Sequence, residues 1–201
     1  MKTSTIRTIA VSGTILLASL SLAGCTINLG TNGSNDDNGM MGNNGMMSQS
    51  KNDSSFSGSD IMFAQMMIPH HQQAVDMGTL AETRAQSPEV KALAAQIKSE
   101  QSPEITQMKG WLKEANAPLE MGHDMGMGGM LTDAQMTALK NATGSEFDKL
   151  YLEGMIAHHE GAIHMAQMVT DSANPEAKAL GKAIIESQTK QIEYMKSLLA
   201  K

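Results

Sequence analysis

A fifteen-residue motif occurs twice in this 201-residue chain. Residues 63–77 read FAQMMIPHHQQAVDM, and residues 151–165 read YLEGMIAHHEGAIHM. Both copies carry a methionine, two adjacent histidines and a further methionine at the same offsets. Such a repeat indicates a duplicated supersecondary unit, because a unit that recurs in one chain folds in the same way each time. The fold must therefore contain two similar halves.

Each copy is followed by a segment with the apolar periodicity of a helix. Both segments begin with a capping residue, a proline and an acid, which is a helix start signal. These starts are Ser87-Pro88-Glu89 and Asn174-Pro175-Glu176. The sequence thus predicts two helical hairpins, 59–86 with 88–115 and 145–172 with 175–200. Four amphipathic helices of this length bury their apolar stripes most simply as an all-α four-helix bundle.

The predicted folded domain, residues 58–201, contains two prolines and one connecting loop that modify this plan. Pro69 and Pro103 fall inside predicted helices and each removes a backbone hydrogen bond, so we expect a kink or, at Pro103, a restart of the helix. Residues 121–130 are rich in glycine and lack apolar periodicity, which predicts a loop. The spacing of Thr132 and Gln135 predicts a capping box and a short helix to about Lys140.

Residues 1–24 predict an export signal, because Lys2 and Arg7 precede an apolar run that contains no acid and is short for a membrane span. The run ends at Cys25 in Leu-Ala-Gly-Cys, which resembles the lipobox of bacterial lipoproteins. We therefore expect a lipidated Cys25 that anchors the protein at the extracytoplasmic face of a bacterial membrane; an unlipidated thiol in a secreted protein is the alternative. Residues 25–57 are polar and predict a disordered linker.

The single cysteine and the acidic charge exclude several classes of protein. With Cys25 acylated, no thiol remains for a disulfide, a zinc thiolate site or a blue-copper site. Any soft ligand must then come from the 19 methionines. The formal net charge of −6 becomes more negative once the basic signal is removed, which argues against nucleic acid as a partner.

The repeated motif places the first histidine of each pair on one helix face with methionines. These residues are His70 with Met66, Met67 and Met77, and His158 with Met155 and Met165. The second histidines, His71 and His159, fall at the helix–helix boundary. Di-iron bundles use a Glu-x-x-His step on two helices, and here the same step reads Met-x-x-His. Exchanging a carboxylate for a thioether favours Cu(I) over iron or manganese.

Structural interpretations of the same residues stay open. Methionine often fills irregular cores, and a lone buried histidine is usually a hydrogen-bonded structural residue. Gln101 and Gln188 occupy equivalent places in the apolar stripes of the two following helices. Their amides are predicted to hydrogen-bond ligand histidines and fix the imidazole tautomer, or else to form an interhelical bond unrelated to metal.

The predicted loop carries a second group of soft side chains. It consists of Met121, His123, Met125, Met127 and Met130. No packing requirement calls for methionines in a flexible polar loop, so we predict a secondary metal site there, with low-complexity drift as the alternative. Methionines 40, 41, 46 and 47 of the linker form a third, weaker candidate or act as scavengers of oxidants.

Residues 60–74 and 147–163, with their paired Met-Ile-x-His-His motifs, are similar to a bacterial exported family known as domain of unknown function 305. The resemblance spans about residues 58–201 and implies a ferritin-like four-helix bundle. Some members of that family bind copper through Met and His and support copper resistance. It therefore implies a copper role for the matching positions Met67, His70, His71, Met77, Met155, His158, His159 and Met165. Asp76 stands where the second copy has His164, so the two half-sites are predicted to be unequal.

Three classes of function remain. The first is a lipid-anchored protein that sequesters Cu(I) or transfers it to a protein partner, without enzymatic activity. The second is a copper- or metal-dependent oxidoreductase, which the low aromatic content of 3% and the missing carboxylate set argue against. The third is a helical interaction or signalling module in which the histidines and methionines are structural.

Overall fold

The computed structural model describes residues 55–121 and 128–201. These residues form the helices α1 (Gly58–Arg84), α2 (Pro88–Glu114), α3 (Asp133–Asn141), α4 (Gly144–Ala166) and α5 (Pro175–Leu199), with a 3-10 turn η1 (Gln167–Val169). No strand occurs in this part of the chain. The predicted export signal, the lipidated Cys25, the linker methionines and three loop residues (His123, Met125 and Met127) lie outside the described residues.

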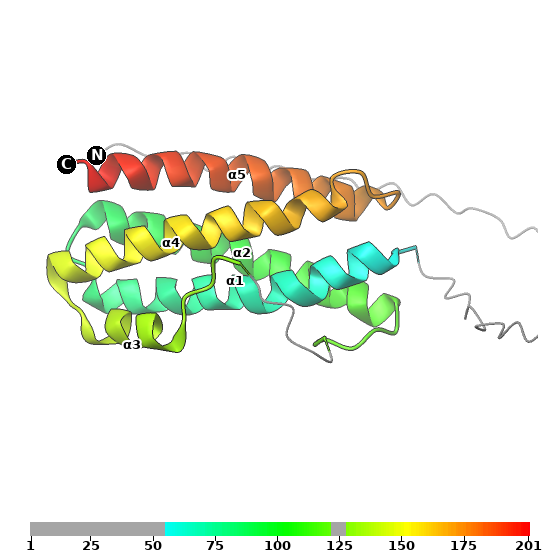
Figure 1. Cartoon of the computed structure of the whole chain (residues 1–201), viewed down its shortest axis with the longest axis horizontal. Coiled ribbons are helices and arrows are strands. Elements are labelled where there is room, and N and C mark those ends of the chain that lie inside the picture. The colour runs from blue at the N-terminus through cyan, green and yellow to red at the C-terminus, as the bar shows by residue number, and fades with distance from the viewer. Residues whose placement is uncertain (1–54, 122–127) are drawn as a thin grey trace, which may run out of the picture. The chain divides into compact units, whose positions relative to one another are not determined.

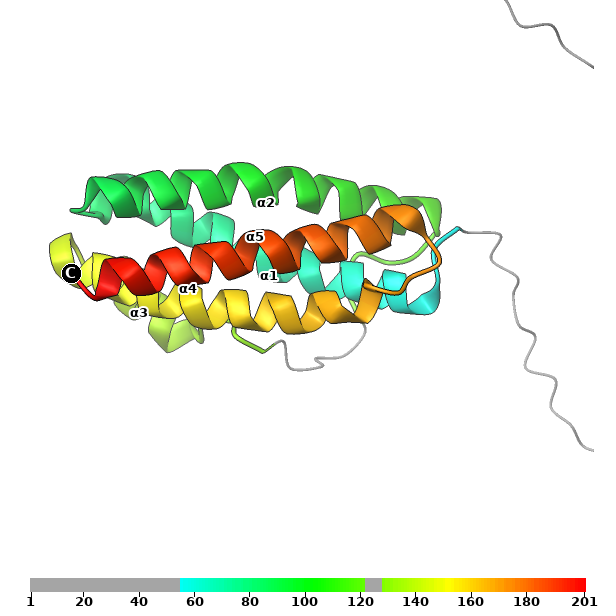
Figure 2. The ribbon, with the colours of Figure 1, turned by 90° about the horizontal axis from the view of Figure 1, so that it is seen from above.

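The four long helices lie side by side as two antiparallel hairpins, α1 with α2 and α4 with α5 (Figures 1 and 2). The hairpins meet mainly through α1 and α4, while α3 lies in the connection between them. Asp148 of α4 also holds the α1–α2 corner, because its carboxylate accepts hydrogen bonds from the backbone N–H of Gln86 (3.0 Å) and Ser87 (2.8 Å). The predicted four-helix bundle of two repeated hairpins is confirmed.

The helix starts follow the predicted caps. Ser87 Oγ accepts hydrogen bonds from the first-turn N–H groups of α2, and Asn174 Oδ1 does the same for α5. Thr132 and Gln135 form the predicted capping box of α3. A cap side chain satisfies N–H groups that have no partner within the helix, which fixes where each helix begins.

The helices differ from the predicted plan at two places. Pro103 does not restart a helix, and α2 runs through it as α1 runs through Pro69. Pro103 is exposed, so water can hydrogen-bond the carbonyl group that the ring leaves without a partner. The predicted helix 145–172 ends early: α4 ends at Ala166, and the chain tightens into η1 so that the buried Val169 side chain packs against Gly181 of α5.

The core is divided into two apolar clusters by a polar layer at mid-height. One cluster combines the C-terminal half of α1 with the N-terminal halves of α2 and α4. The other combines the opposite halves of the same helices, and each cluster also receives one end of α5. The polar layer between them contains buried side chains from all four long helices. They are His70, His71, Gln101, His158, His159, Gln188 and Gln191.

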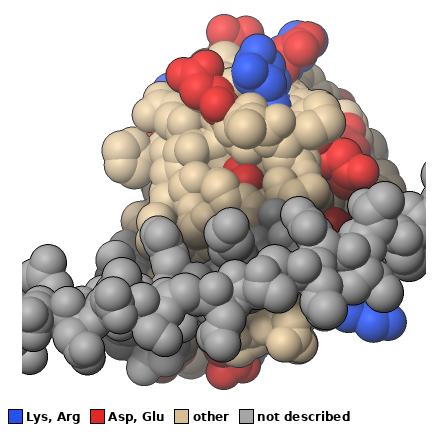
Figure 3. Space-filling view, turned by 90° about the vertical axis from the view of Figure 1, so that its right-hand side faces the viewer, with Lys and Arg blue, Asp and Glu red and all other residues tan. Residues whose placement is uncertain are grey.

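None of the described helices combines the length and the hydropathy that a membrane span requires. The bundle end seen in Figure 3 is largely uncharged at its centre, with charged side chains of both signs mainly toward its edges. No basic patch is visible among the described residues on this face, in keeping with the acidic charge of the chain.

Candidate metal-binding site

The polar layer has two histidines at its centre, which we call the inner histidines: His70 of α1 and His158 of α4. Their rings pack against each other with centroids 3.7 Å apart and planes inclined by 38°. Both side chains are fully buried, and their four ring nitrogens have no hydrogen-bond partner. A buried polar atom without a partner costs roughly 1–3 kcal/mol. The fold therefore tolerates an arrangement that destabilises the metal-free bundle.

Buried methionines lie on both sides of this pair. Met67 and Met165 belong to one apolar cluster, and Met77 and Met155 belong to the other. All four are at most 3% exposed. Each pair takes one thioether from each copy of the repeat, so the two copies contribute equally to both sides. Met66, which the helical wheel places beside His70, is only half-buried.

The outer histidines, His71 and His159, lie behind the inner pair and are also fully buried. His71 Nε2 lies 2.8 Å from a carboxylate oxygen of Glu104 in α2. Because an ionised carboxylate only accepts hydrogen bonds, His71 must carry its proton on Nε2. His159 Nε2 makes the corresponding contact, at 2.7 Å, with Gln191 Oε1 in α5. In both residues Nδ1 is buried and has no partner, so each presents a free lone pair.

Sequence reasoning missed Glu104 and Gln191 and selected Gln101 and Gln188 instead. These two glutamines do lie in the polar layer, and their Oε1 atoms are buried without a partner. The histidine contacts come from three residues further along each helix. The available signal was positional: Glu104 and Gln191 each stand sixteen residues after the proline that opens their helix. A role for Gln101 and Gln188 in orienting ligand histidines stays a prediction.

Burial keeps three of these imidazoles, His70, His158 and His159, neutral near pH 7. Burial lowers the pKa of His70 to about 3; the neighbouring His71 and His159 lower it further, and the nearby Gly128 backbone opposes the shift. Burial likewise lowers the pKa of His159 to about 4, against the hydrogen bond that His159 donates to Gln191 Oε1, which raises it. The pKa of His158 falls well below its usual range, mainly through burial and then through His70. Neutral imidazole is the form that binds metals.

The donor set fits a soft metal and not a hard one. Within residues 55–121 and 128–201, no group of three or more His, Cys, Asp and Glu side chains is placed to hold a metal ion. An ion in the polar layer would thus need thioether sulfur in addition to imidazole nitrogen. That combination suits Cu(I), whereas Mg²⁺, Ca²⁺ and Mn²⁺ prefer oxygen ligands.

The end of the methionine-rich loop packs against the same part of α4. A Cβ atom on Gly161 would collide with the carbonyl oxygen of Gly128, so only glycine permits this contact. Gln73 of α1 donates to the Leu131 carbonyl (2.9 Å) and accepts from the Leu131 N–H (2.7 Å). Of the predicted loop ligands, Met121 and Met130 are described and half-buried. Met130 lines a groove together with Ala157, the residue that precedes His158 in the sequence.

Comparison with known proteins extends over the whole bundle. The family model of a domain of unknown function, DUF305, matches residues 60–199. One similar solved structure is that of a DUF305 protein from Streptomyces coelicolor that is inferred to be secreted. It is 36% identical, with 71% of this chain and 91% of that chain covered and a TM-score of 0.68. A DUF305 fragment from Deinococcus radiodurans is 29% identical, with coverages of 72% and 97% and a TM-score of 0.65.

A third similar structure is that of CopM with Cu(I) bound. It is 34% identical, with 69% of this chain and 94% of CopM covered and a TM-score of 0.59. CopM structures with bound Cu(II) and Ag also match. No curated protein matches the chain. The solved structures similar to this chain thus include a protein with bound Cu(I), Cu(II) or Ag.

Proposed function

Because the chain belongs to the DUF305 family, as its repeated motif predicts, we propose that it binds Cu(I) within the polar layer of its bundle. The observation that carries this proposal is the set of six buried imidazole nitrogens without partners, in four histidines, between two pairs of buried methionines. A protein interior rarely leaves so many polar atoms unpaired without a functional reason. Copper bound by CopM, a 34% identical relative, supports the choice of metal.

We assign the ligand roles by what each side chain leaves free. A neutral imidazole has a single lone pair, so His70 and His158 each offer one of their two ring nitrogens, and His71 and His159 offer Nδ1. Met67 and Met165 on one side, and Met77 and Met155 on the other, supply thioether sulfur. Cu(I) bound by several of these donors would satisfy their lone pairs and lower the penalty of burying them unpaired. The loop methionines and His123 are proposed as a secondary, collecting site.

We further propose that the protein is exported, lipidated at Cys25 and active in copper sequestration, delivery or resistance at the cell envelope, and that it is not an enzyme. The order of basic residues, apolar run and Leu-Ala-Gly-Cys supports the export and the anchor. The full burial of the inner histidines favours holding copper over turning over a substrate. Delivery would require a copper-accepting protein outside the membrane.

The decisive experiment is an anaerobic Cu(I) titration of the purified protein against a competing chelator. Replacing both inner histidines, as His70→Ala with His158→Ala, should weaken binding by on the order of 100-fold or more, because it removes both central ligands. The matched control is His164→Ala, an exposed histidine in the same helix as His158, which should bind like the unmodified protein. Unchanged binding in the double variant would move the site elsewhere, and no binding by any form would end the proposal.

A further inference from the structure

The two hairpins orient their outer histidines with different residues at equivalent positions. Glu104 in α2 corresponds to Gln191 in α5, and Glu100 in α2 corresponds to Ser187 in α5. In the first hairpin, Glu104 contacts His71 directly. In the second, the contact with His159 comes from a neutral amide, which can either donate or accept. By itself, Gln191 would leave the tautomer of His159 undetermined.

Glu100 removes this ambiguity from across the bundle. Gln191 Nε2 donates a hydrogen bond to Glu100 Oε2 at 2.7 Å, although Glu100 belongs to the other hairpin. The carboxylate only accepts, so the amide must direct its N–H₂ toward Glu100 and its oxygen toward His159. His159 must then donate through Nε2, which leaves the lone pair on Nδ1. Gln96 donates to the second Glu100 oxygen at 2.8 Å and holds the carboxylate in place.

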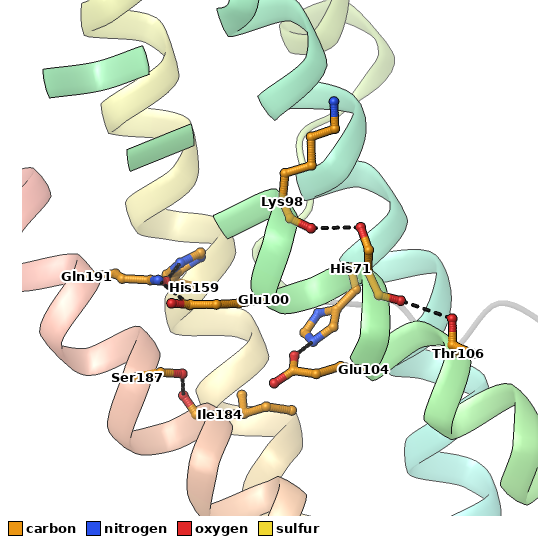
Figure 4. A network of polar contacts seen from close by, with 10 residues as sticks. His71, Lys98, Glu100, Glu104, Thr106, His159, Ile184, Ser187 and Gln191 are labelled. Atoms are coloured by element: carbon orange, nitrogen blue, oxygen red, sulfur yellow. Dashed lines mark hydrogen bonds and ion pairs between the residues drawn. The ribbon is translucent and has the colours of Figure 1, made fainter. Parts of the chain in front are cut away.

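Figure 4 shows this chain of contacts beside its counterpart. Glu100 and Glu104 leave the same helix one turn apart, the first toward Gln191 and His159, the second toward His71. Both hairpins thus obtain their anionic acceptor from α2. Glu100 and Gln191 also line a groove of about 480 Å³ between α2 and α5, together with Glu186, whose carboxylate contacts Lys190 instead.

We propose that Glu100 is a positioning residue for His159: through Gln191 it fixes the Nε2–H tautomer, so that Nδ1 of His159 presents its lone pair to the polar layer. Glu104 performs the same task for His71 in one step. The significance of this lone pair as a metal ligand rests on the proposed function, but the tautomer itself is a property of the metal-free protein. A Glu100 that merely tied α2 to α5 would affect stability and leave the imidazole unchanged.

The test is the pattern of ¹⁵N chemical shifts of the histidine rings in the metal-free, full-length protein near neutral pH. In the unmodified protein, His159 should be protonated on Nε2 alone. Glu100→Ser copies the residue of the second hairpin and should give a mixture of tautomers at His159, with His71 unchanged. Glu186→Ser, in the same groove, is the control and should change neither ring. An Nδ1-protonated His159, or a ring unaffected by Glu100→Ser, would overturn the proposal.

A second substitution tests the logic by rescue. Combining Glu100→Ser with Gln191→Glu rebuilds in the second hairpin the arrangement that His71 has in the first, and should restore the single Nε2–H tautomer. Cu(I) affinity should fall about 10-fold in the single variant and recover in the double variant. If the tautomers respond as expected but no form binds Cu(I), the proposed function fails and the positioning role stands. If Cu(I) binds normally and the tautomers do not respond, the positioning role fails alone.

Discussion

The two hairpins agree at the inner histidines and differ at almost every residue that supports them. His70 and His158 are equally buried and equally without partners. Around them, a carboxylate holds one outer histidine and an amide holds the other. The two hairpins also contact the end of the loop differently. In α1 the Gln73 side chain hydrogen-bonds the Leu131 backbone, whereas in α4 the equivalent residue, Gly161, has no side chain and so lets the Gly128 backbone approach. Donors recur in a duplicated site, whereas the means of orienting them can diverge.

The largest expected effect is on the pH dependence of stability, which tests whether the hairpins contribute equally. The pKa of His70 (about 3), of His159 (about 4) and of His158 is lower in the fold than the usual value of 6.5. The unfolded state therefore binds more protons, so stability rises with pH and is lost as pH falls below about 6.5. Each histidine adds up to ~1.4 kcal/mol per pH unit to the slope of the free energy of unfolding against pH. The three together give a slope on the order of 4 kcal/mol per pH unit.

This slope is measured by denaturant unfolding of the metal-free protein between neutral pH and about pH 4.5, a window that follows from the same pKa shifts. His70→Leu and His158→Leu should each flatten the curve by a similar amount. A flat curve for the unmodified protein would contradict the buried, neutral state of these rings. A strongly unequal response of the two variants would contradict the equivalence of the inner histidines.

Replacing both inner histidines with leucine should stabilise the metal-free protein while it abolishes tight Cu(I) binding. The change removes four buried nitrogens without partners and replaces them with apolar surface, so we expect a gain of about 2–4 kcal/mol. Thermal unfolding without metal measures it. Replacing the outer histidines instead should destabilise, because Glu104 and Gln191 would lose their partners. Destabilisation by the leucine pair would indicate that the inner rings have partners in solution.

The two ways of holding the loop give a pair of variants with similar expected costs. Gly161→Ala places a methyl group against the Gly128 carbonyl and should cost about 1–3 kcal/mol. Gln73→Ala removes two hydrogen bonds to Leu131 and should cost about 1–3 kcal/mol. Gly110→Ala, in open space on α2, is the control and should stabilise by about 0.5–1 kcal/mol. Denaturant midpoints compare the three, and neutral behaviour of Gly161→Ala would show that residues 128–131 do not pack on α4.

The smallest expected effect is that of changing the hydrogen-bond partner of His71, one of the two outer histidines. Glu104→Gln gives the first hairpin the amide of the second but no cross-hairpin carboxylate to orient it. We expect a stability loss of about 1 kcal/mol and a few-fold weaker Cu(I) binding, since a charge-assisted hydrogen bond becomes a neutral one. The ring ¹⁵N shifts of His71 should change and those of His159 should not. A response confined to His159 would reverse our assignment of the two networks.

Much of this architecture is predictable from local patterns. The caps at Ser87, Asn174 and Thr132 depend on neighbouring residues, and the sequence places them correctly. The end of α4 is not predictable in this way, because it depends on how closely Gly181 of α5 lets the turn approach.

The supporting residues of the site are harder still to predict. Glu100 and Gln191 are 91 residues apart and lie beside the apolar stripes, where a polar side chain normally faces solvent. Gln73 and Gly161 are equivalent positions with unrelated side chains, so the repeat itself conceals their common task. The candidate ligands could be predicted because both copies of the repeat contain them. The residues that orient those ligands could not, because they differ between the two copies.

The mid-height polar layer and the two apolar clusters beside it also bear on whether a single hairpin could fold alone. Each apolar cluster draws on both hairpins, and each hairpin owns only one imidazole of the inner pair. A hairpin alone would expose half of both cores, and the arrangement that covers them is a second hairpin related by a two-fold axis through the histidine contact. Because the two hairpins belong to one polypeptide, they can differ in ways that identical subunits could not: α2 supplies Glu100 and Glu104 to both halves, whereas α5 has Ser187 and Gln191 at the equivalent positions.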